Sequence, residues 1–411
     1  MHKRKNSVIM LLIVCVALVL NGCGPTTPAP ASGVTPAAAG LPTEPLGAVY
    51  KIGAIYDVTG PASSLGIPER DTAQMLADEL KAAGGILGPD GLLHPVEIVI
   101  YDSQSDETKT VLAAKKLIEE DKVSAIIGPT QSGTTLAVLD IVQTAGVPLV
   151  SNAASIKITE PAAERTWVFK TAPSDRLVVG ALVEYLKGEG ITKVGWMSAN
   201  NAFGDSGKIE FEAAAPGAGI EIVAAEKYEA TDTDMSAQLT KIRGADPQAL
   251  IVWSTPPSAS IVTKNAYDLG LDLPIFHSHG IANQTFIDLA TKEAAEGVRF
   301  PVGKIVVADQ LPDADPQKAV LLGYAAQYQA AFGVPPVTFG GHAWDAVKLL
   351  VQVMQQAGPD RAKIRDELEK TQGFVGIGGV FNFSATEHGG LDSSALVIVE
   401  ILDGQWKLVQ K

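Results

Sequence analysis

The chain has 411 residues, enough for two or three domains or for one two-lobed protein. Lys and Arg number 32 against 46 Asp and Glu, a net charge of −14. This charge argues against binding to nucleic acid, or to an anionic surface, by electrostatic attraction.

The first 22 residues have the pattern of an export signal peptide. Residues 2–5, HKRK, are basic, and an apolar run from Val8 to Leu20 follows. This run is short for a membrane span. It ends in Leu-Asn-Gly-Cys, which looks like a bacterial lipobox with Cys23 as the lipidated residue. The alternative is an ordinary signal peptide that is cut nearby. Loss of Lys3, Arg4 and Lys5 takes the charge to −14 − 3 = −17.

The chain has two cysteines, and neither is expected in a disulfide. Cys15 lies within the signal and would be removed with it, whereas Cys23 would carry the lipid. The core must therefore be stable without a disulfide. Residues 23–49 are rich in Pro, Ala, Thr and Gly, a composition typical of a flexible tether. We expect a folded body held away from a membrane.

From residue 50 to about 280, apolar strand patterns alternate with helical patterns. The predicted strands are 50–56, 96–101, 125–127, 147–150, 167–170, 194–197, 221–225, 249–253 and 274–276. Predicted helices include 69–83, 107–121, a helix that ends at 187, and 235–243. Such alternation implies parallel sheets covered by helices on both faces. Ligands of such sheets bind at the carboxyl ends of the strands.

The later part of the chain has a different pattern. Residues 317–331, 343–357 and 360–370 are predicted to form three helices, and 380–383 and 396–402 two strands. Gly404 predicts a turn into residues 406–409, so the chain should end in a hairpin.

Residues 124–155 predict a strand, a polar turn, a helix and a second strand. The turn, residues 130–135, leaves unpaired backbone N–H groups at a helix N-terminus, which favours a negative charge. The small polar segment 151–155 follows the second strand and should lie beside this turn. Together, the turn and this segment could bind a small carboxylate. The alternative is that Ser132 or Thr134 only caps the helix.

Eight motifs in order make the body, residues 50–409, resemble a known family. They are DVTGP, AGGILG, YDSQSD, IIGPTQSGTT, VPLVSNAAS, FKTAPSD, NNAFGDSG and the closure from FNFS to VEILDG. The sequence resembles the branched-chain amino-acid-binding (Leu/Ile/Val-binding) family of type I periplasmic binding proteins, the substrate-binding lipoproteins of ABC transporters.

The resemblance implies an α/β fold of two Rossmann-like lobes joined by three crossovers, with a ligand cleft between the lobes. We place the crossovers near Pro173, Pro301 and Asp392. Lobe one is then 50–172 plus 302–391, and lobe two is 173–301 plus 392–411. The family closes its lobes on a ligand and delivers it to an ABC permease. We expect an exported monomer without a cofactor, anchored to the membrane through Cys23, in the periplasm or on the cell surface.

The resemblance also assigns the lobe-one side of the ligand site. Ser132, in the turn that includes Gly133 and Thr134, matches the serine that meets the ligand carboxylate. Residues 153–155 match an Ala-Ala-Thr segment that meets both ends of the amino acid. These are Ala153, Ala154 and Ser155. Leu65 matches a cleft side chain of the first loop.

On the lobe-two side the sequence departs from the family. Phe203 replaces a tyrosine that covers the ligand, and Pro256 replaces a second tyrosine. His279 replaces the acidic residue that accepts the ligand ammonium, a role that needs oxygen acceptors. Asp175 resembles an amine-contacting residue of related receptor domains and is a candidate replacement. The alternative is that Asp175 only caps its helix.

These features predict an extracytoplasmic binding protein of an ABC importer for an amino acid of branched-chain or related apolar type, or for a similar small carboxylate. Phe203, Leu65 and Trp344 are candidates for apolar walls, although Trp344 also fits plain helix packing. The alternatives are a binder of a non-amino organic or aromatic acid or amide, or a ligand sensor for a membrane receptor.

A catalytic role has little support in the sequence. No Gly-x-Ser-x-Gly elbow, Walker loop or GxGxxG motif after the first strand is present. His277 and His279 alternate and could face the same side of a strand, but no third ligand accompanies them, so we expect no metal site. A secreted hydrolase is the alternative from a different class.

Overall fold

The computed structural model describes residues 46–409. The predicted signal peptide, Cys23 and most of the predicted tether lie outside the described residues. Within 46–409, no helix is both long enough and apolar enough to cross a membrane.

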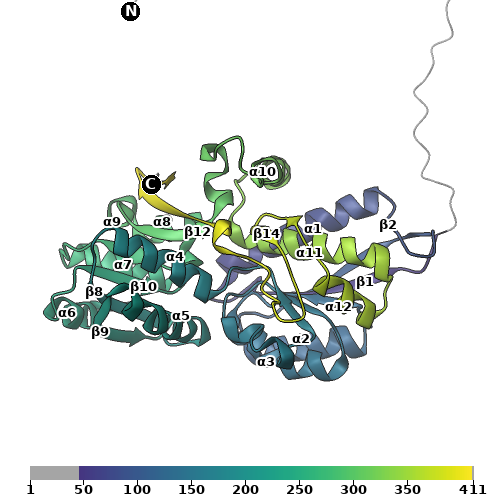
Figure 1. The fold of residues 1–411 in the computed structure, drawn as a ribbon, viewed down its shortest axis with the longest axis horizontal. Helices are drawn as coiled ribbons and strands as arrows, with labels where there is room; N and C mark the ends of the chain where they lie inside the picture. Colours follow the sequence, from purple (N-terminus) through teal and green to yellow (C-terminus); the bar gives the residue numbers. More distant parts are fainter. Residues whose placement is uncertain (1–45, 410–411) are drawn as a thin grey trace, which may run out of the picture. The chain divides into compact units, whose positions relative to one another are not determined.

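The first sheet is parallel, with five strands in the order β4-β1-β5-β6-β7. Its strands are β1 (Tyr50–Tyr56), β4 (Val96–Asp102), β5 (Ala125–Ile127), β6 (Leu149–Ser151) and β7 (Val168–Lys170). The accompanying helices are α1 (Ser63–Ala82), α2 (Glu107–Glu119), α3 (Ser132–Ala145), α11 (Thr338–Ala357), α12 (Arg361–Glu369), η1 (Ile156–Ile158) and η2 (Ala162–Glu164). We call this sheet with its helices the five-stranded lobe; it lies to the right in Figure 1.

Alternate residues of each strand in the five-stranded lobe contact different helices. Ala125 and Ile127 pack in the cluster that includes α1, α11 and α12, while Ile126 between them packs with α2 and α3. The apolar run of this strand is thus buried on both faces, as its sequence predicts. Two short hairpins complete this part: β2 (Ile86–Leu87) with β3 (Leu93–His94), and β13 (Phe374–Val375) with β14 (Val380–Phe381).

The second sheet has seven strands in the order β16-β15-β12-β11-β10-β8-β9. Five run parallel: β8 (Lys193–Ala199), β9 (Glu221–Tyr228), β10 (Ala249–Trp253), β11 (Ile275–His277) and β12 (Arg299–Gly303). The antiparallel strands are β15 (Leu396–Leu402) and β16 (Gln405–Leu408), which form the predicted C-terminal hairpin. We call this sheet with its helices the seven-stranded lobe; it lies to the left in Figure 1.

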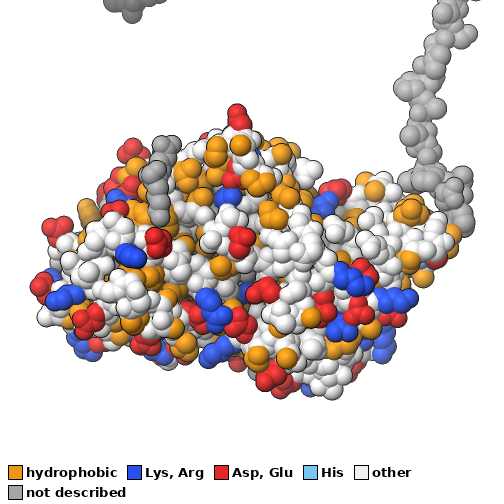
Figure 2. Space-filling view, viewed as in Figure 1, with side chains coloured by type: hydrophobic (Ala, Val, Ile, Leu, Met, Phe, Trp, Pro, Cys, Tyr) orange, Lys and Arg blue, Asp and Glu red, His pale blue; other side chains and the backbone are white. Residues whose placement is uncertain are grey.

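The helices of the seven-stranded lobe follow its strands. They are α4 (Asp175–Gly188), α5 (Ala202–Ala214), η3 (Ala215–Ala218), α6 (Ser236–Gly244), α7 (Ser258–Asp268), η4 (His279–Ile281), α8 (Gln284–Ala290) and α9 (Lys292–Ala295). Connecting segments are η5 (Lys304–Gln310), α10 (Lys318–Phe332) and η6 (Ser393–Ala395). Positive and negative side chains are intermixed on the face shown in Figure 2.

The chain passes between the two sheets three times. It leaves β7 at Lys170 and enters α4 at Asp175, and it returns to the seven-stranded sheet through η6 before β15. Pro301 lies inside β12, which pairs with β15 as far as Gly303. The second passage therefore begins after Gly303, close to the position near Pro301 that the sequence suggested. We keep the residue limits of the two lobes as a proposal.

Two helices begin earlier than predicted, for reasons of packing. Helix α1 starts at Ser63 rather than residue 69, and its Gly66 packs against the backbone of Asp57, where a Cβ would lie 2.3 Å from the carbonyl oxygen. Helix α11 starts at Thr338 rather than 343. Its Gly340 packs against Tyr324, with a Cβ position 2.4 Å from the hydroxyl. These glycines favour loops in isolation, but close tertiary contacts require them in helices.

Candidate functional site

A cavity of about 260 Å³ lies between the two lobes, at the carboxyl ends of their strands. The five-stranded lobe contributes Leu65, Ser105, Glu107, Thr130, Gln131, Ser132, Gly133, Thr134, Asn152, Ala153, Ala154 and Ala172. The seven-stranded lobe contributes Asn200, Asn201, Ala202, Phe203, Thr255, His279 and Gly280. Phe339 and His342 of α11 complete the wall. The cavity has the position of a small-molecule site in an α/β protein, at the carboxyl ends of the strands.

The N-terminus of α3 forms one wall of the cavity. Its N-cap residue, Gln131, makes no side-chain capping bond, and the first helical bond runs from the Thr135 N–H to the Gln131 carbonyl at 2.9 Å. The N–H groups of Ser132, Gly133 and Thr134 precede that bond, so the helix does not satisfy them. These three N–H groups and the helix dipole suit an anion.

The alternative in which a hydroxyl only caps α3 is wrong. The Thr134 hydroxyl donates to the Gln131 carbonyl at 3.0 Å, so it is not accepting from the helix amides. The Ser132 Oγ accepts from the Ser155 N–H of the neighbouring loop at 3.2 Å. Both hydroxyls thus leave the amides at the start of the helix unsatisfied.

The loops after β5 and β6 lie side by side, as the sequence predicts. Ile126 pairs with Leu149 in the parallel ladder, and beyond the strands the Thr135 and Ser151 hydroxyls lie 3.0 Å apart. Adjacent parallel strands end at the same edge of a sheet. This adjacency brings Ala153 and Ala154 into the cavity wall next to the α3 N-terminus.

A group of buried carboxyls fixes the loop after β5 from behind. The Thr130 hydroxyl accepts from the Asp57 N–H at 3.1 Å and donates to Glu69. The Gln131 side chain donates to Asp57 at 2.7 Å. Burial raises the pKa of Asp57 to about 6, against the hydrogen bonds it accepts, and raises the pKa of Glu69 well above its ordinary value.

An aromatic cluster forms the wall from the seven-stranded lobe. Phe203, near the start of α5, lies edge to face with His279, with ring centroids 5.6 Å apart. The buried Trp253 of β10 lies behind both, 6.0 Å from Phe203 and 6.4 Å from His279. Leu65 of α1 adds an apolar side chain from the five-stranded lobe.

Three of the residues predicted for the site do not line the cavity. Ser155 is buried behind Ala154 with its hydroxyl unpaired, and Pro256 follows the lining residue Thr255. Asp175 is fully buried against Ser206 and Trp253 of the seven-stranded lobe. It does not cap its helix, because Ser174 accepts the capping bond from Leu177 at 3.3 Å.

Trp344 also lies outside the cavity. Its ring packs 6.4 Å from both Tyr324 and Phe374, within the helix contacts that the sequence offered as its alternative role. His277 is directed elsewhere too: β11 ends at His277, whose Nε2 lies 2.9 Å from the Thr263 hydroxyl. In the part of the chain that is described, no cluster of His, Cys, Asp and Glu has the geometry of a metal site.

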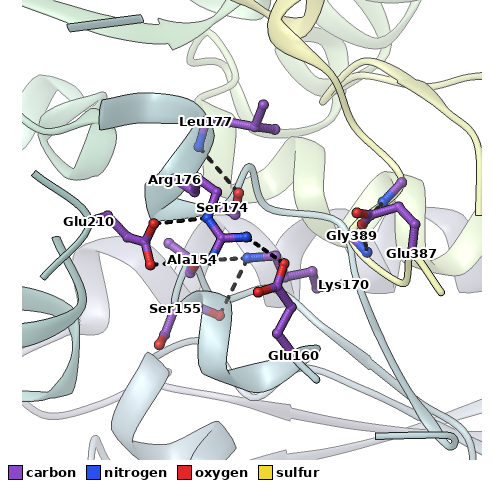
Figure 3. Close-up of polar contacts among 11 residues, drawn as sticks. Ala154, Ser155, Glu160, Lys170, Ser174, Arg176, Leu177, Glu210, Glu387 and Gly389 are labelled. Atoms are coloured by element: carbon purple, nitrogen blue, oxygen red, sulfur yellow. Dashed lines mark hydrogen bonds and ion pairs between the residues drawn. The ribbon is translucent and has the colours of Figure 1, made fainter. Parts of the chain in front are cut away.

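The buried pair Lys170 and Asp175 lies beside the cavity, at the first passage between the lobes. Lys170 Nζ donates to the Ala154 carbonyl at 2.6 Å and to the Ser155 carbonyl at 3.5 Å (Figure 3). The Asp175 N–H donates to the same Ala154 carbonyl at 3.2 Å. Burial lowers the pKa of Lys170 and raises that of Asp175, and the opposite charge of the partner offsets each shift in part.

His342 and Phe339 were missed by the sequence reasoning. They lie in the first turns of α11, which the sequence predicted to begin only at residue 343. Burial lowers the pKa of both His279 and His342 to about 3, so both rings are neutral at physiological pH. A single sequence carries no signal that would bring residue 342 to strands more than 60 residues earlier in the chain.

Residues 49–405 match the family model described as "Periplasmic binding protein". The chain belongs to the periplasmic binding protein family. The Leu/Ile/Val-binding protein BraC3 of Rhizobium johnstonii is 28% identical over 75% of this chain and 79% of that protein. An extracellular ligand-binding receptor of Rhodopseudomonas palustris HaA2 is 30% identical, with a TM-score of 0.81 over 88% of this chain and 99% of that one.

A further similar structure was solved with a ligand. It is the branched-chain amino acid transporter substrate binding protein LivJ of Streptococcus pneumoniae, in complex with isoleucine. That protein is 28% identical and has a TM-score of 0.77 over 88% of this chain and 99% of its own. The resemblance to type I periplasmic binding proteins of the Leu/Ile/Val-binding group, and the two-lobed α/β fold, are confirmed. The family is one of solute-binding proteins rather than enzymes.

Proposed function

We propose that this periplasmic binding protein is the substrate-binding lipoprotein of an ABC importer and binds a small carboxylate by closure of its two lobes. The expected ligands are an amino acid of branched-chain or related apolar type, or a similar small acid. The N-terminus of α3 carries this proposal, because three helix amides with no acceptor in the helix face a cavity between the lobes. Ligand contacts from both lobes would stabilise the closed state.

We assign the contacts within the cavity by their position. Ser132, Gly133 and Thr134 hold the carboxylate, and Ala153 and Ala154 pack against the ligand beside it. Leu65 and Phe203 enclose its apolar part. Micromolar affinity from these contacts corresponds to about −8 kcal/mol.

Isothermal titration of the purified protein with branched-chain amino acids and small aromatic acids tests the ligand class. For a ligand that binds, Gly133→Asp should weaken binding at least 100-fold, because the new carboxylate competes for the helix amides. The matched variant Gly133→Asn has nearly the same size without the charge and should cost less than tenfold. Binding of sugars or cations only, or equal effects of the two variants, would refute the proposal.

The anchor and the transport role are tested in cells. Cys23→Ala should move the protein from the membrane fraction to the soluble exported fraction. Deletion of the chain should reduce uptake of the labelled ligand. Binding without any loss of uptake would instead favour a sensor that presents its closed form to a membrane receptor.

An organic acid without an amino group is the second candidate for the ligand. His279 stands at the position that the family resemblance assigns to the ammonium-binding acid, and its ring is neutral. The carboxylate in the cavity wall, that of Glu107, is exposed to solvent beside Gly133. The described wall therefore has no buried negative charge that could bind the ammonium of an amino acid.

A further inference from the structure

Two histidines from different parts of the fold line the cavity. His279 comes from η4 of the seven-stranded lobe and His342 from α11, which packs on the five-stranded lobe. Both side chains line the cavity, and the two residues are 7% and 4% exposed. They are close enough for a charge on His342 to disfavour a charge on His279.

The hydrogen bonds of these rings indicate which nitrogen carries the proton. Within residues 46–409, Nδ1 of each ring is buried and has no hydrogen-bond partner. A buried N–H without an acceptor is rare in proteins, because its hydration is lost without replacement. We therefore place the proton of each neutral ring on Nε2, because Nε2 is not among the buried nitrogens that lack a partner. Both rings then present an N–H donor to the cavity.

Further donors lie near the two rings. The one carboxylate among the described lining residues, Glu107, is exposed to solvent, and the amides of Asn152, Asn200 and Asn201 can donate or accept. The three amides at the start of α3 face the cavity, and the buried ammonium of Lys170 lies behind Ala154. The positive charge of Lys170 acts on both histidines and would act on a bound cation in the same direction. This set of donors matches oxygen acceptors on a ligand and does not match an ammonium, which only donates.

We infer that the ligand is an apolar carboxylate that carries a carbonyl or hydroxyl oxygen in place of an ammonium group, the chemistry of a 2-oxo or 2-hydroxy acid. The inference rests on the proposed function, because it takes the α3 N-terminus as the site of the carboxylate. The His279 and His342 donors bind the additional oxygen. A 2-oxo acid accepts from both rings, and a hydroxyl oxygen has two lone pairs and does the same.

The test uses four compounds that differ at a single carbon. They are 4-methyl-2-oxopentanoate, 2-hydroxy-4-methylpentanoate, leucine and 4-methylpentanoate, which carry a carbonyl, a hydroxyl, an ammonium and no substituent. The full exported chain, dialysed to remove copurified ligand, is titrated with each by calorimetry. We expect the oxo or the hydroxy acid to bind at least tenfold more tightly than both leucine and 4-methylpentanoate.

Variants of the two rings then test their role. His279→Phe and His342→Phe should each reduce the preference for the oxygen-bearing acid over 4-methylpentanoate to less than threefold. His94→Phe is the control, because it removes a buried imidazole that does not line the cavity and should leave the preference intact. The four-compound comparison on the unmodified protein remains decisive where a histidine variant fails to fold.

Each outcome separates the two proposals. Tightest binding of leucine, or equal binding of all four compounds, would overturn the inference and leave the small-carboxylate function standing. No binding of any of the four, together with binding of a compound without a carboxylate, would overturn the proposed function as well. An unchanged preference in both histidine variants would show that other residues recognise the oxygen.

Discussion

Lys170 offers a direct test of how the first passage between the lobes is stabilised. The side chain is fully buried, its ammonium donates to the carbonyls of Ala154 and Ser155, and its opposite charge is Asp175, also fully buried. Lys170→Met keeps the length of the side chain and removes its charge and its donors. The variant leaves Asp175 without its buried cation, and the Ala154 carbonyl loses its shortest hydrogen bond.

The expected cost follows from this burial. Lys170 and Asp175 form no direct ion pair in the described chain, and both carboxylate oxygens of Asp175 lack a hydrogen-bond partner there. Removing the ammonium leaves the Ala154 and Ser155 carbonyls without this donor and the buried carboxyl without a compensating charge, which should lower the free energy of unfolding by about 1–3 kcal/mol. The double variant Lys170→Met/Asp175→Asn has no unpaired charge and should recover at least half of that loss. The control is Lys227→Met, whose ion pair with Asp205 at 2.5 Å is 46% exposed on both sides. Lys227→Met should lower the free energy of unfolding by less than about 1 kcal/mol.

Urea unfolding followed by tryptophan fluorescence and by circular dichroism measures these differences. Two probes are needed because the lobes of a two-lobed protein can unfold separately. The reasoning is refuted if Lys170→Met costs no more than Lys227→Met. It is also refuted if the double variant is less stable than Lys170→Met, because the unpaired charge is then not the source of the loss.

Two further predictions concern packing and pH. Gly207→Ala should destabilise the protein by about 1–3 kcal/mol, because the new Cβ would lie 2.2 Å from the Trp253 ring, whereas Gly180→Ala in open space on α4 should stabilise it by about 0.5–1 kcal/mol. Equal effects in urea unfolding would contradict this. The pKa of Asp57, about 6 against an ordinary 3.8, means that the folded chain holds a proton between these pH values that the unfolded chain has lost. Asp57 should therefore lower the free energy of unfolding by about 2 kcal/mol as pH rises from 4 to 6, and Asp57→Asn should reduce the measured fall by this amount; an unchanged slope in the variant would refute it.

Local sequence patterns determined much of this protein. The alternation of strands and helices predicts parallel sheets covered by helices, and the turn at residues 130–135 predicts the helix N-terminus that forms one wall of the cavity. The predicted adjacency of the two strands in this stretch holds as well. These features depend on residues near one another in the chain, where periodicity, glycines and hydroxyls act directly on the backbone.

Only the tertiary structure decided which side chains reach the cavity. His342 and His279 line the same cavity because α11 packs on the five-stranded lobe, and Gly340 of this helix lies against the distant Tyr324, where a Cβ would not fit. Ser155 follows the cavity residue Ala154, and Asp175 lies three residues after Ala172, yet both side chains are buried away from the ligand space. Local sequence therefore fixes where the carboxylate site can form, whereas contacts between distant segments select the groups that face the rest of the ligand.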